Sequence, residues 1–301
     1  MRHSMTLVAA LCLACGGGGG GETDTATDSV QDTITDTAHD TTADSPADTP
    51  ADTPAEEIPP GVDRGPDTTV VFLHHSTGGC IWGGGVPGWF DDYNTAHSTG
   101  YSVTEVAFPS SDGYGWANYP YDYWNIWVSH AGPDPYMTEP TLEILTPDYD
   151  VVVFKHCFPV SSIGPDTGSP DIASSTQTDE NYRLQYQALK DKLRSFPSNR
   201  FIVWTGAALT AASTTPDEAA RARAFFEWVK TTWDEPGDNI FVWDFFELET
   251  EGGNTLLDEH AASPDDSHPS DAFSAEAAPL FSQRIVNVIQ GLGDSTSLTG
   301  E

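Results

Sequence analysis

Short, continuous runs of apolar residues recur along the chain between residues 68 and 245. Polar or turn-forming residues bound each run at both ends. Runs of this kind are typical of β-strands that are buried on both faces, as in parallel sheets. We therefore predict five strands, over residues 68–75 (TTVVFLHH), 101–108, 149–155 (YDVVVFK), 200–205 (RFIVWT) and 239–245 (NIFVWDF).

A helical period appears between and after the later runs. Residues 181–196 carry large apolar side chains three and four positions apart, which places them on one face. Residues 215–218 (TPDE) combine a capping box with proline at the first helical position, so a helix is expected from Thr215 to about residue 233. A last helix is expected over residues 274–290, with Gly291 suited to its C-terminal cap.

Strands that alternate with helices predict a three-layer α/β/α domain around a mostly parallel, roughly five-stranded sheet, as in flavodoxin-like folds. The domain is expected to cover residues 67–292, and residues 293–301 are expected to form a flexible tail. In such sheets ligands bind at the carboxyl ends of the strands. The residues that directly follow each run are therefore the first candidates for a site.

The first 15 residues (MRHSMTLVAALCLAC) have the features of an export signal. Arg2 gives a positive start, and residues 6–14 are mostly apolar but too few to cross a bilayer. The end at Cys15, followed by a run of glycines, resembles the lipobox of a bacterial lipoprotein, although Cys12 stands where that pattern prefers leucine. The resemblance implies a protein anchored by lipid on Cys15 at the outer membrane or cell surface. An ordinary secretory signal cut near Ala14 is the alternative.

Residues 16–66 have the composition of a linker. After the glycines, aspartate occupies every fourth position from Asp24 to Asp52, mostly followed by threonine or serine, and prolines fill the second half. Like charges at this spacing repel each other in a helix, and nothing apolar recurs that could be buried. We predict an extended, disordered tether. Cation binding by the aspartates is the alternative.

The chain is strongly acidic, with 12 Lys+Arg against 46 Asp+Glu and a formal net charge of -34. Nucleic-acid binding needs a cationic surface that displaces counterions from phosphates, so this class of function is excluded. The acidic residues lie in the folded part as well as in the tether. This charge favours a neutral or cationic substrate over an anionic one.

Two short segments carry residues suited to nucleophilic catalysis. Residues 74–80 (HHSTGGC) follow the first predicted strand, and residues 265–269 (DDSHP) precede the last predicted helix. A serine in a glycine-containing turn after a strand can be exposed and can use backbone N–H groups to bind an oxyanion. A histidine can act as its base, and a carboxylate can orient the imidazole.

An early serine, a late Asp-x-x-His and an α/β body between them resemble the layout of SGNH (GDSL-like) hydrolases. The resemblance implies the same three-layer fold and no cofactor. It implies Ser76 as the nucleophile, His268 as the base and Asp265 as the orienting carboxylate, with Asp266 as the second candidate.

The sequence departs from the family pattern near the oxyanion hole. His74 and His75 stand where the family has Gly-Asp. Gly113 or Gly115 is the candidate for the glycine N–H of the second block. The third block lacks its usual asparagine, and the candidate donors that follow the third predicted strand are Lys155 and His156.

Cys80 and Cys157 are the two cysteines outside the signal. Because an exported protein meets an oxidising environment, we predict a disulfide between them that braces the serine turn against the loop after the third strand. Two unlinked thiols are the alternative, and a nucleophilic Cys157 is a further one.

A stretch dense in aromatic residues lies between the second and third predicted strands. Its rings are candidates for a substrate pocket that accepts flat, partly polar groups such as sugars, and the alternative is that they cover the sheet. The pocket candidates are Tyr114, Trp116 and Trp124.

The leading hypothesis is a monomeric, lipid-anchored serine esterase that hydrolyses small acyl esters, including carbohydrate O-acyl groups, without a metal. Its only expected membrane contact is the anchor. The missing asparagine motivates one alternative, an inactive surface lipoprotein that binds glycans through the aromatic stretch. A metallohydrolase using His74, His75, His156 and His268 is the other, although these histidines lack a tight ligand spacing.

Overall fold

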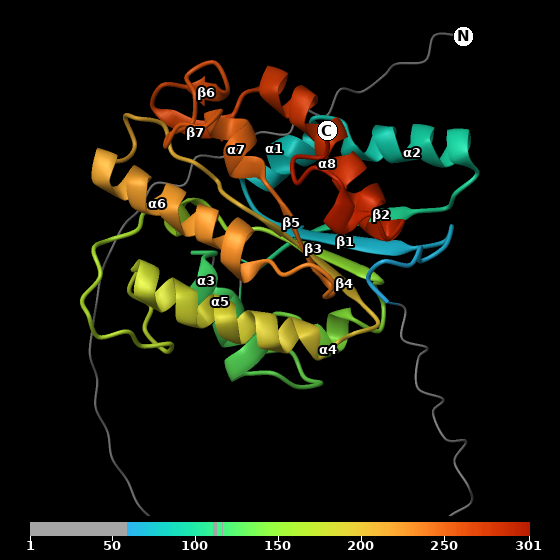
Figure 1. Ribbon diagram of the computed structural model, residues 1–301, viewed down its shortest axis with the longest axis horizontal. Coiled ribbons are helices and arrows are strands. Elements are labelled where there is room, and N and C mark those ends of the chain that lie inside the picture. Colours follow the sequence, from blue (N-terminus) through green and yellow to red (C-terminus); the bar gives the residue numbers. More distant parts are fainter. Residues whose placement is uncertain (1–58, 111–112, 116) are drawn as a thin grey trace, which may run out of the picture. The chain divides into compact units, whose positions relative to one another are not determined.

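A computed structural model describes residues 59–110, 113–115 and 117–301. A single five-stranded sheet forms its centre, with strand order β2-β1-β3-β4-β5 and all neighbours parallel (Figure 1). The predicted strand positions are confirmed, and the strand order is that of flavodoxin-like doubly wound folds. The strands are β1 (Thr69–His74), β2 (Ser102–Ala107), β3 (Val151–Phe154), β4 (Arg200–Trp204) and β5 (Ile240–Trp243).

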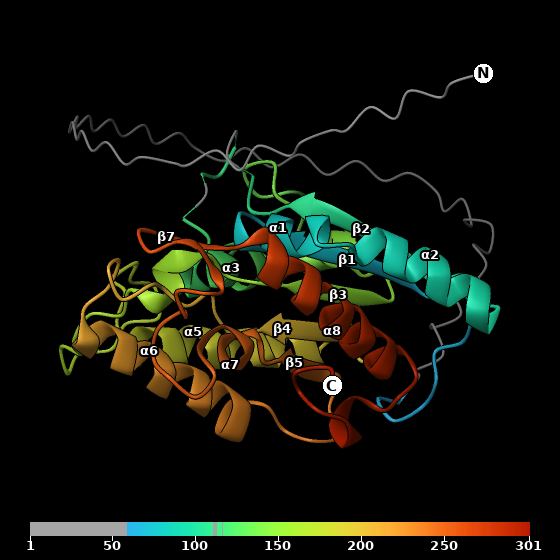
Figure 2. The same ribbon diagram turned by 90° about the horizontal axis from the view of Figure 1, so that it is seen from above.

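Helices cover both faces of the sheet, so the predicted three-layer α/β/α fold is confirmed (Figures 1 and 2). Alternate residues of β1 enter the two cores. Val71 and Leu73 face one layer, whereas Val70 and Phe72 face the other. The first layer consists of α3 (Pro120–Trp124), α4 (Leu142–Leu145), α5 (Asp179–Arg194) and α6 (Pro216–Trp228), and the second of α1 (Thr77–Gly83), α2 (Val86–His97) and α8 (Asp271–Ile289).

The edge strand β2 differs from the prediction that every strand is buried on both faces. Most of its side chains are exposed, including Val106, whereas β3, β4 and β5 are buried throughout. The physical reason is the helical cover, because α5 and α8 both contact the other edge strand, β5, whereas no described helix has a comparable contact with β2.

Helix boundaries follow the predicted caps. Thr215 accepts a hydrogen bond from the Glu218 N–H and caps α6, whose path continues as a π-helical turn over Val229–Trp233. The last helix begins earlier than expected, because Ser270 caps it.

No helix in the described ranges is both long and apolar enough to span a membrane. Further elements are α7 (Phe245–Thr250), a π-turn over Asn125–Ser129, 3₁₀ turns over Phe158–Ser161 and Gly293–Ser295, and the hairpin of β6 (Ala261–Ser263) and β7 (Asp266–Pro269).

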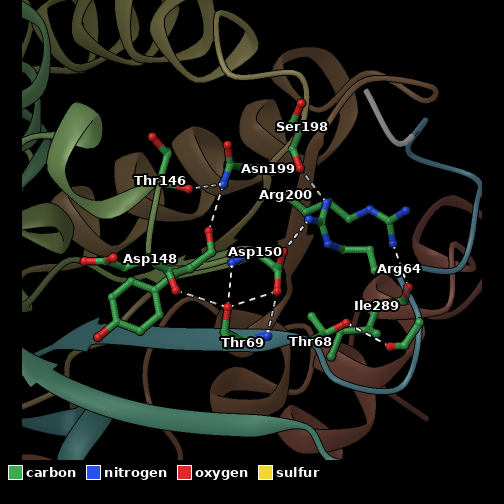
Figure 3. Close-up of polar contacts among 12 residues, drawn as sticks. Arg64, Thr68, Thr69, Thr146, Asp148, Asp150, Ser198, Asn199, Arg200 and Ile289 are labelled. Atoms are coloured by element: carbon green, nitrogen blue, oxygen red, sulfur yellow. Dashed lines mark hydrogen bonds and ion pairs between the residues drawn. The ribbon is translucent and has the colours of Figure 1, made fainter. Parts of the chain in front are cut away.

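A polar clasp at the amino ends of the strands holds residues 59–66 to the domain (Figure 3). Arg64 donates to Asp150 Oδ1 at 2.7 Å and to the Ser198 carbonyl at 2.6 Å, while the Thr69 N–H donates to Asp150 Oδ2 at 2.8 Å. The buried Arg200 donates to the carbonyls of Ile289 and Pro59. The folded domain thus begins before residue 67, where the sequence placed the end of the linker.

The C-terminal residues also pack on the domain. The Asp244 N–H donates to the Leu298 carbonyl at 2.9 Å, and the Trp243 indole N–H donates to the Thr299 carbonyl at 2.9 Å. Residues 293–301 are therefore held at the carboxyl end of β5, in contrast to the flexible tail that we expected. The signal segment, Cys15 and residues 16–58 of the tether lie outside the described residues.

Candidate active site

Ser76 lies in a tight turn between β1 and α1, at the point where the strand order reverses. Its φ of 50° and ψ of -110° are unusual for a residue with a side chain, and such backbone strain is often found at functional sites. The turn is closed by hydrogen bonds from the Gly78 N–H to the His75 carbonyl and from the Gly79 N–H to the Ser76 carbonyl. A Cβ at Gly78 would lie 2.5 Å from the Cβ of His74, so glycine is required for this close approach.

His268 reaches Ser76 from the β6–β7 hairpin, which packs beside α1. Its Nε2 shares a hydrogen bond with Ser76 Oγ. The Phe158 ring, which follows β3, meets the imidazole edge-on at a centroid distance of 5.2 Å. The structure thus brings together a serine and a histidine that lie at opposite ends of the domain sequence.

Asp266, not Asp265, is the carboxylate beside His268. Asp266 Oδ1 accepts hydrogen bonds from His268 Nδ1 at 2.6 Å and from the His268 backbone N–H at 3.0 Å. The choice of Asp265 was wrong because β7 is a strand, and residues two apart in a strand lie on the same face. Asp265 falls in the turn that precedes β7 and is exposed.

The charge state of Asp266 suits the orienting role. Partial burial alone would raise the pKa of this carboxyl, but the two hydrogen bonds from His268 outweigh burial and lower it. On the other face of β7, Ser267 Oγ accepts the Thr210 N–H at 3.0 Å. This bond ties the hairpin to the loop after β4 and fixes the strand that carries both Asp266 and His268.

Among the described residues, none of the four expected oxyanion donors is hydrogen-bonded to Ser76 Oγ, whose partner is His268. Gly113 packs against Met137 and Thr138, and Gly115 donates its N–H to the Ser110 carbonyl. Lys155 is completely buried, and its Nζ donates to the His75 carbonyl at 3.1 Å, on the backbone just before Ser76.

His156 is also completely buried and meets the Tyr123 ring edge-on at a centroid distance of 4.6 Å. Burial, with a smaller contribution from the charge of Lys155, lowers the pKa of His156 to about 3, so its imidazole is neutral at physiological pH. Within the described residues neither of its ring nitrogens has a hydrogen-bond partner. This histidine lies in the core.

Much of the aromatic stretch covers the sheet. Tyr123 on α3 and Trp127 on the π-turn that follows it are fully buried in the core, as the alternative interpretation proposed. Tyr114 and Trp124 are partly buried, and their ring contacts are with Tyr136 and Tyr121 respectively. These contacts do not connect either ring to Ser76, and Trp116 lies outside the described residues.

The predicted disulfide is absent, because Cys80 and Cys157, the two cysteines that the structure describes, are not bonded to each other. Cys80 belongs to α1 on one face of the sheet. The Cys157 N–H donates to the carbonyl of Asn118, in the segment that leads into α3 on the other face. The two cysteine loops are thus tied to different helical layers.

The four histidines considered as metal ligands have separate partners. His74 Nε2 pairs with Glu105 Oε2 at 2.9 Å, and His75 Nε2 is hydrogen-bonded to the carbonyl oxygen of Pro109. His156 is buried and His268 is paired with Asp266. In the described part of the chain, no group of three or more His, Cys, Asp or Glu residues is arranged to hold a metal.

No protein-family model matches the chain, and no curated protein matches it. Solved structures with a similar fold include an acetyl xylan esterase (15% identity, TM-score 0.42, 70% of this chain and 96% of that one). A second is a GDSL-like lipase from Bacteroides thetaiotaomicron (11% identity, TM-score 0.40, 74% of this chain and 87% of that one). A third is an acylhydrolase candidate from Bacteroides fragilis (14% identity, TM-score 0.43, 78% of this chain and 93% of that one). At such low identities and TM-scores, an activity for this chain has to be argued from its own side chains.

Proposed function

We propose that this protein is a serine ester hydrolase of the SGNH type, with Ser76 as the nucleophile, His268 as the base and Asp266 as the orienting carboxylate. The observation that carries the proposal is the continuous hydrogen-bonded chain from Ser76 Oγ through both ring nitrogens of His268 to Asp266. It lies at the carboxyl edge of the sheet, where doubly wound folds bind their ligands.

The arrangement supports a two-step acyl transfer. His268 Nε2 takes the Ser76 proton as Oγ attacks the ester carbonyl, and Asp266 stabilises the imidazolium that forms. The backbone N–H of Ser76 binds the oxyanion of the tetrahedral intermediate. His268 then protonates the departing alcohol, and a water molecule, deprotonated by the same histidine, hydrolyses the acyl-enzyme to the free acid.

The charge of the chain narrows the substrate class. A net charge of -34 repels anions, so we propose a neutral or cationic ester with a small acyl group, such as an O-acylated carbohydrate. An inactive glycan-binding protein is the second candidate, because no asparagine follows β3 as a further oxyanion donor.

Covalent labelling tests the hydrolase directly. A fluorophosphonate probe should modify Ser76 in the folded protein, because only an activated serine attacks such a probe quickly. Peptide mass spectrometry would locate the adduct, and the same preparation should hydrolyse p-nitrophenyl acetate. An unlabelled, inert protein that binds polysaccharides would instead favour the glycan-binding candidate.

We further propose that the enzyme is exported and held at the cell envelope by lipid on Cys15. The support is the apolar segment that ends in Leu-Ala-Cys and the charged, proline-rich tether behind it. Wild-type protein produced in a bacterial host should fractionate with membranes, and Cys15→Ser should release it. Equal fractionation of the two would contradict the anchor.

A further inference from the structure

We infer that Lys155 is a positioning residue for the proposed hydrolysis, acting from behind the serine turn through the peptide group between His75 and Ser76. The inference rests on the proposed function. Lys155 is completely buried and does not touch the space in front of Ser76, so its action on the reaction is indirect.

The fold brings the lysine under the turn. Lys155 follows the last residue of β3, and its N–H continues the sheet ladder to the Leu73 carbonyl. Val151 and Val153 face the layer that contains α1 and α8. Lys155 comes two residues later and continues on that face, where its Nζ donates to the His75 carbonyl at 3.1 Å.

That carbonyl and the N–H of Ser76 belong to one planar peptide group. The carbonyl oxygen accepts the Gly78 N–H at 3.0 Å as well as the lysine ammonium. A charged donor on the oxygen draws electron density from the nitrogen, and hydrogen bonds that share a group strengthen one another. In the described residues the Ser76 N–H has no acceptor of its own, so the strengthened donor is left for the oxyanion.

A buried acid lies near the lysine. Glu249 on α7 is also completely buried, and its Oε2 accepts the Ala208 N–H at 2.6 Å, just after β4. Burial lowers the pKa of Lys155, and the nearby Cys157 and Glu249 oppose this shift. Burial also raises the pKa of Glu249 well above its usual range, which favours the protonated carboxyl.

Stability alone gives little reason for a lysine at this place. A buried ammonium group is costly unless it is paired and hydrogen-bonded, and in the described part of the chain Lys155 forms no ion pair and donates one side-chain hydrogen bond. A role in the reaction explains why the charge is here. The chain lacks the asparagine of related hydrolases after β3, and Lys155 strengthens the remaining donor from the opposite side of the backbone.

Kinetics of Lys155→Met on p-nitrophenyl acetate test the inference. Deleting an oxyanion donor typically costs 10²–10³ in kcat, so weakening one should lower kcat by about 10- to 100-fold. KM should stay within about twofold, because the donor acts on the transition state. The rate of phosphonylation by a fluorophosphonate should fall by a similar factor. A purely structural role would not lower kcat and the phosphonylation rate together while leaving KM unchanged.

Two further variants control for folding. Lys155→Met/Glu249→Leu removes both buried groups, so that no carboxyl remains in the core without the lysine near it. Lys190→Met is the matched control, because Lys190 is also buried and donates to a backbone carbonyl, that of Trp233, but lies on α5 in the other layer. We expect the double variant to behave like Lys155→Met, and Lys190→Met to lose stability while keeping wild-type kcat.

Wild-type kcat and phosphonylation in folded Lys155 variants would overturn the inference. So would an equal kcat loss in Lys190→Met, or failure of both Lys155 variants to fold while Lys190→Met folds, since either result assigns Lys155 a structural role. Ser76→Ala in the same assay separates the two proposals. An active Ser76→Ala variant would contradict the proposed hydrolase mechanism itself. An inactive Ser76→Ala variant together with fully active Lys155 variants would contradict only the proposed role of Lys155.

Discussion

Ser76→Ala should lower kcat for p-nitrophenyl acetate by about 10⁴-fold or more and leave the fold unchanged. Loss of the nucleophile removes the covalent path, and mutation of such serines in other hydrolases costs up to about 10⁶ in kcat. The substitution keeps a Cβ at the strained position, so the turn backbone faces the same constraint in both proteins. Steady-state kinetics and circular dichroism measure the two effects.

Ser98→Ala is the matched control for this substitution. Ser98 ends α2 with a φ of 56°, so it is another serine with a left-handed backbone, and it is exposed. The control should keep full activity. If Ser76→Ala kept more than about a tenth of the wild-type rate, the hydrolysis would need another nucleophile and the proposed mechanism would be wrong.

Asp266→Asn should reduce kcat by about 10²- to 10⁴-fold, whereas Asp265→Asn should change it less than twofold. An amide beside His268 Nδ1 can donate where the carboxylate accepts, and it then favours the tautomer that cannot take the serine proton. The lower limit of the range reflects exposure, since 48% of the Asp266 side chain is accessible and water can replace part of its effect.

The two neighbouring aspartates provide the control in one experiment. Both substitutions remove one negative charge from the same hairpin, so a difference between them reports on contact with the imidazole and not on the overall field. A larger loss in Asp265→Asn, or equal losses in both, would contradict the assignment of Asp266.

Local patterns in the sequence were sufficient where the structure depends on neighbours along the chain. The central strands were predictable because runs such as the Val151–Phe154 segment are apolar on both faces. The start of α6 was predictable because Thr215 and Glu218 satisfy each other's backbone N–H groups without help from the rest of the fold. Short elements such as α1 were missed, since seven residues carry no helical period.

The site was predictable only in part. Ser76 and His268 could be selected because their residue types and their places beside the first strand and the last helix limit the choice. The preference for Asp265 followed a family spacing and ignored the alternation that β7 imposes. The disulfide and the oxyanion donors depended on which layer each loop joins. Burial of Lys155 and the links from Cys157 to Asn118 come from contacts between distant segments, which the sequence does not encode locally.

The clasp around Arg64 fixes the point where the preceding chain enters the domain. Residues 59–64 lie at the amino edge of the sheet, whereas Ser76 lies at the carboxyl edge. A bead, fusion partner or cell surface joined to the chain ahead of residue 59 is therefore attached at the end opposite Ser76. For the hydrolase that we propose, the junction with the preceding chain and the reactive serine therefore lie at opposite edges of the sheet.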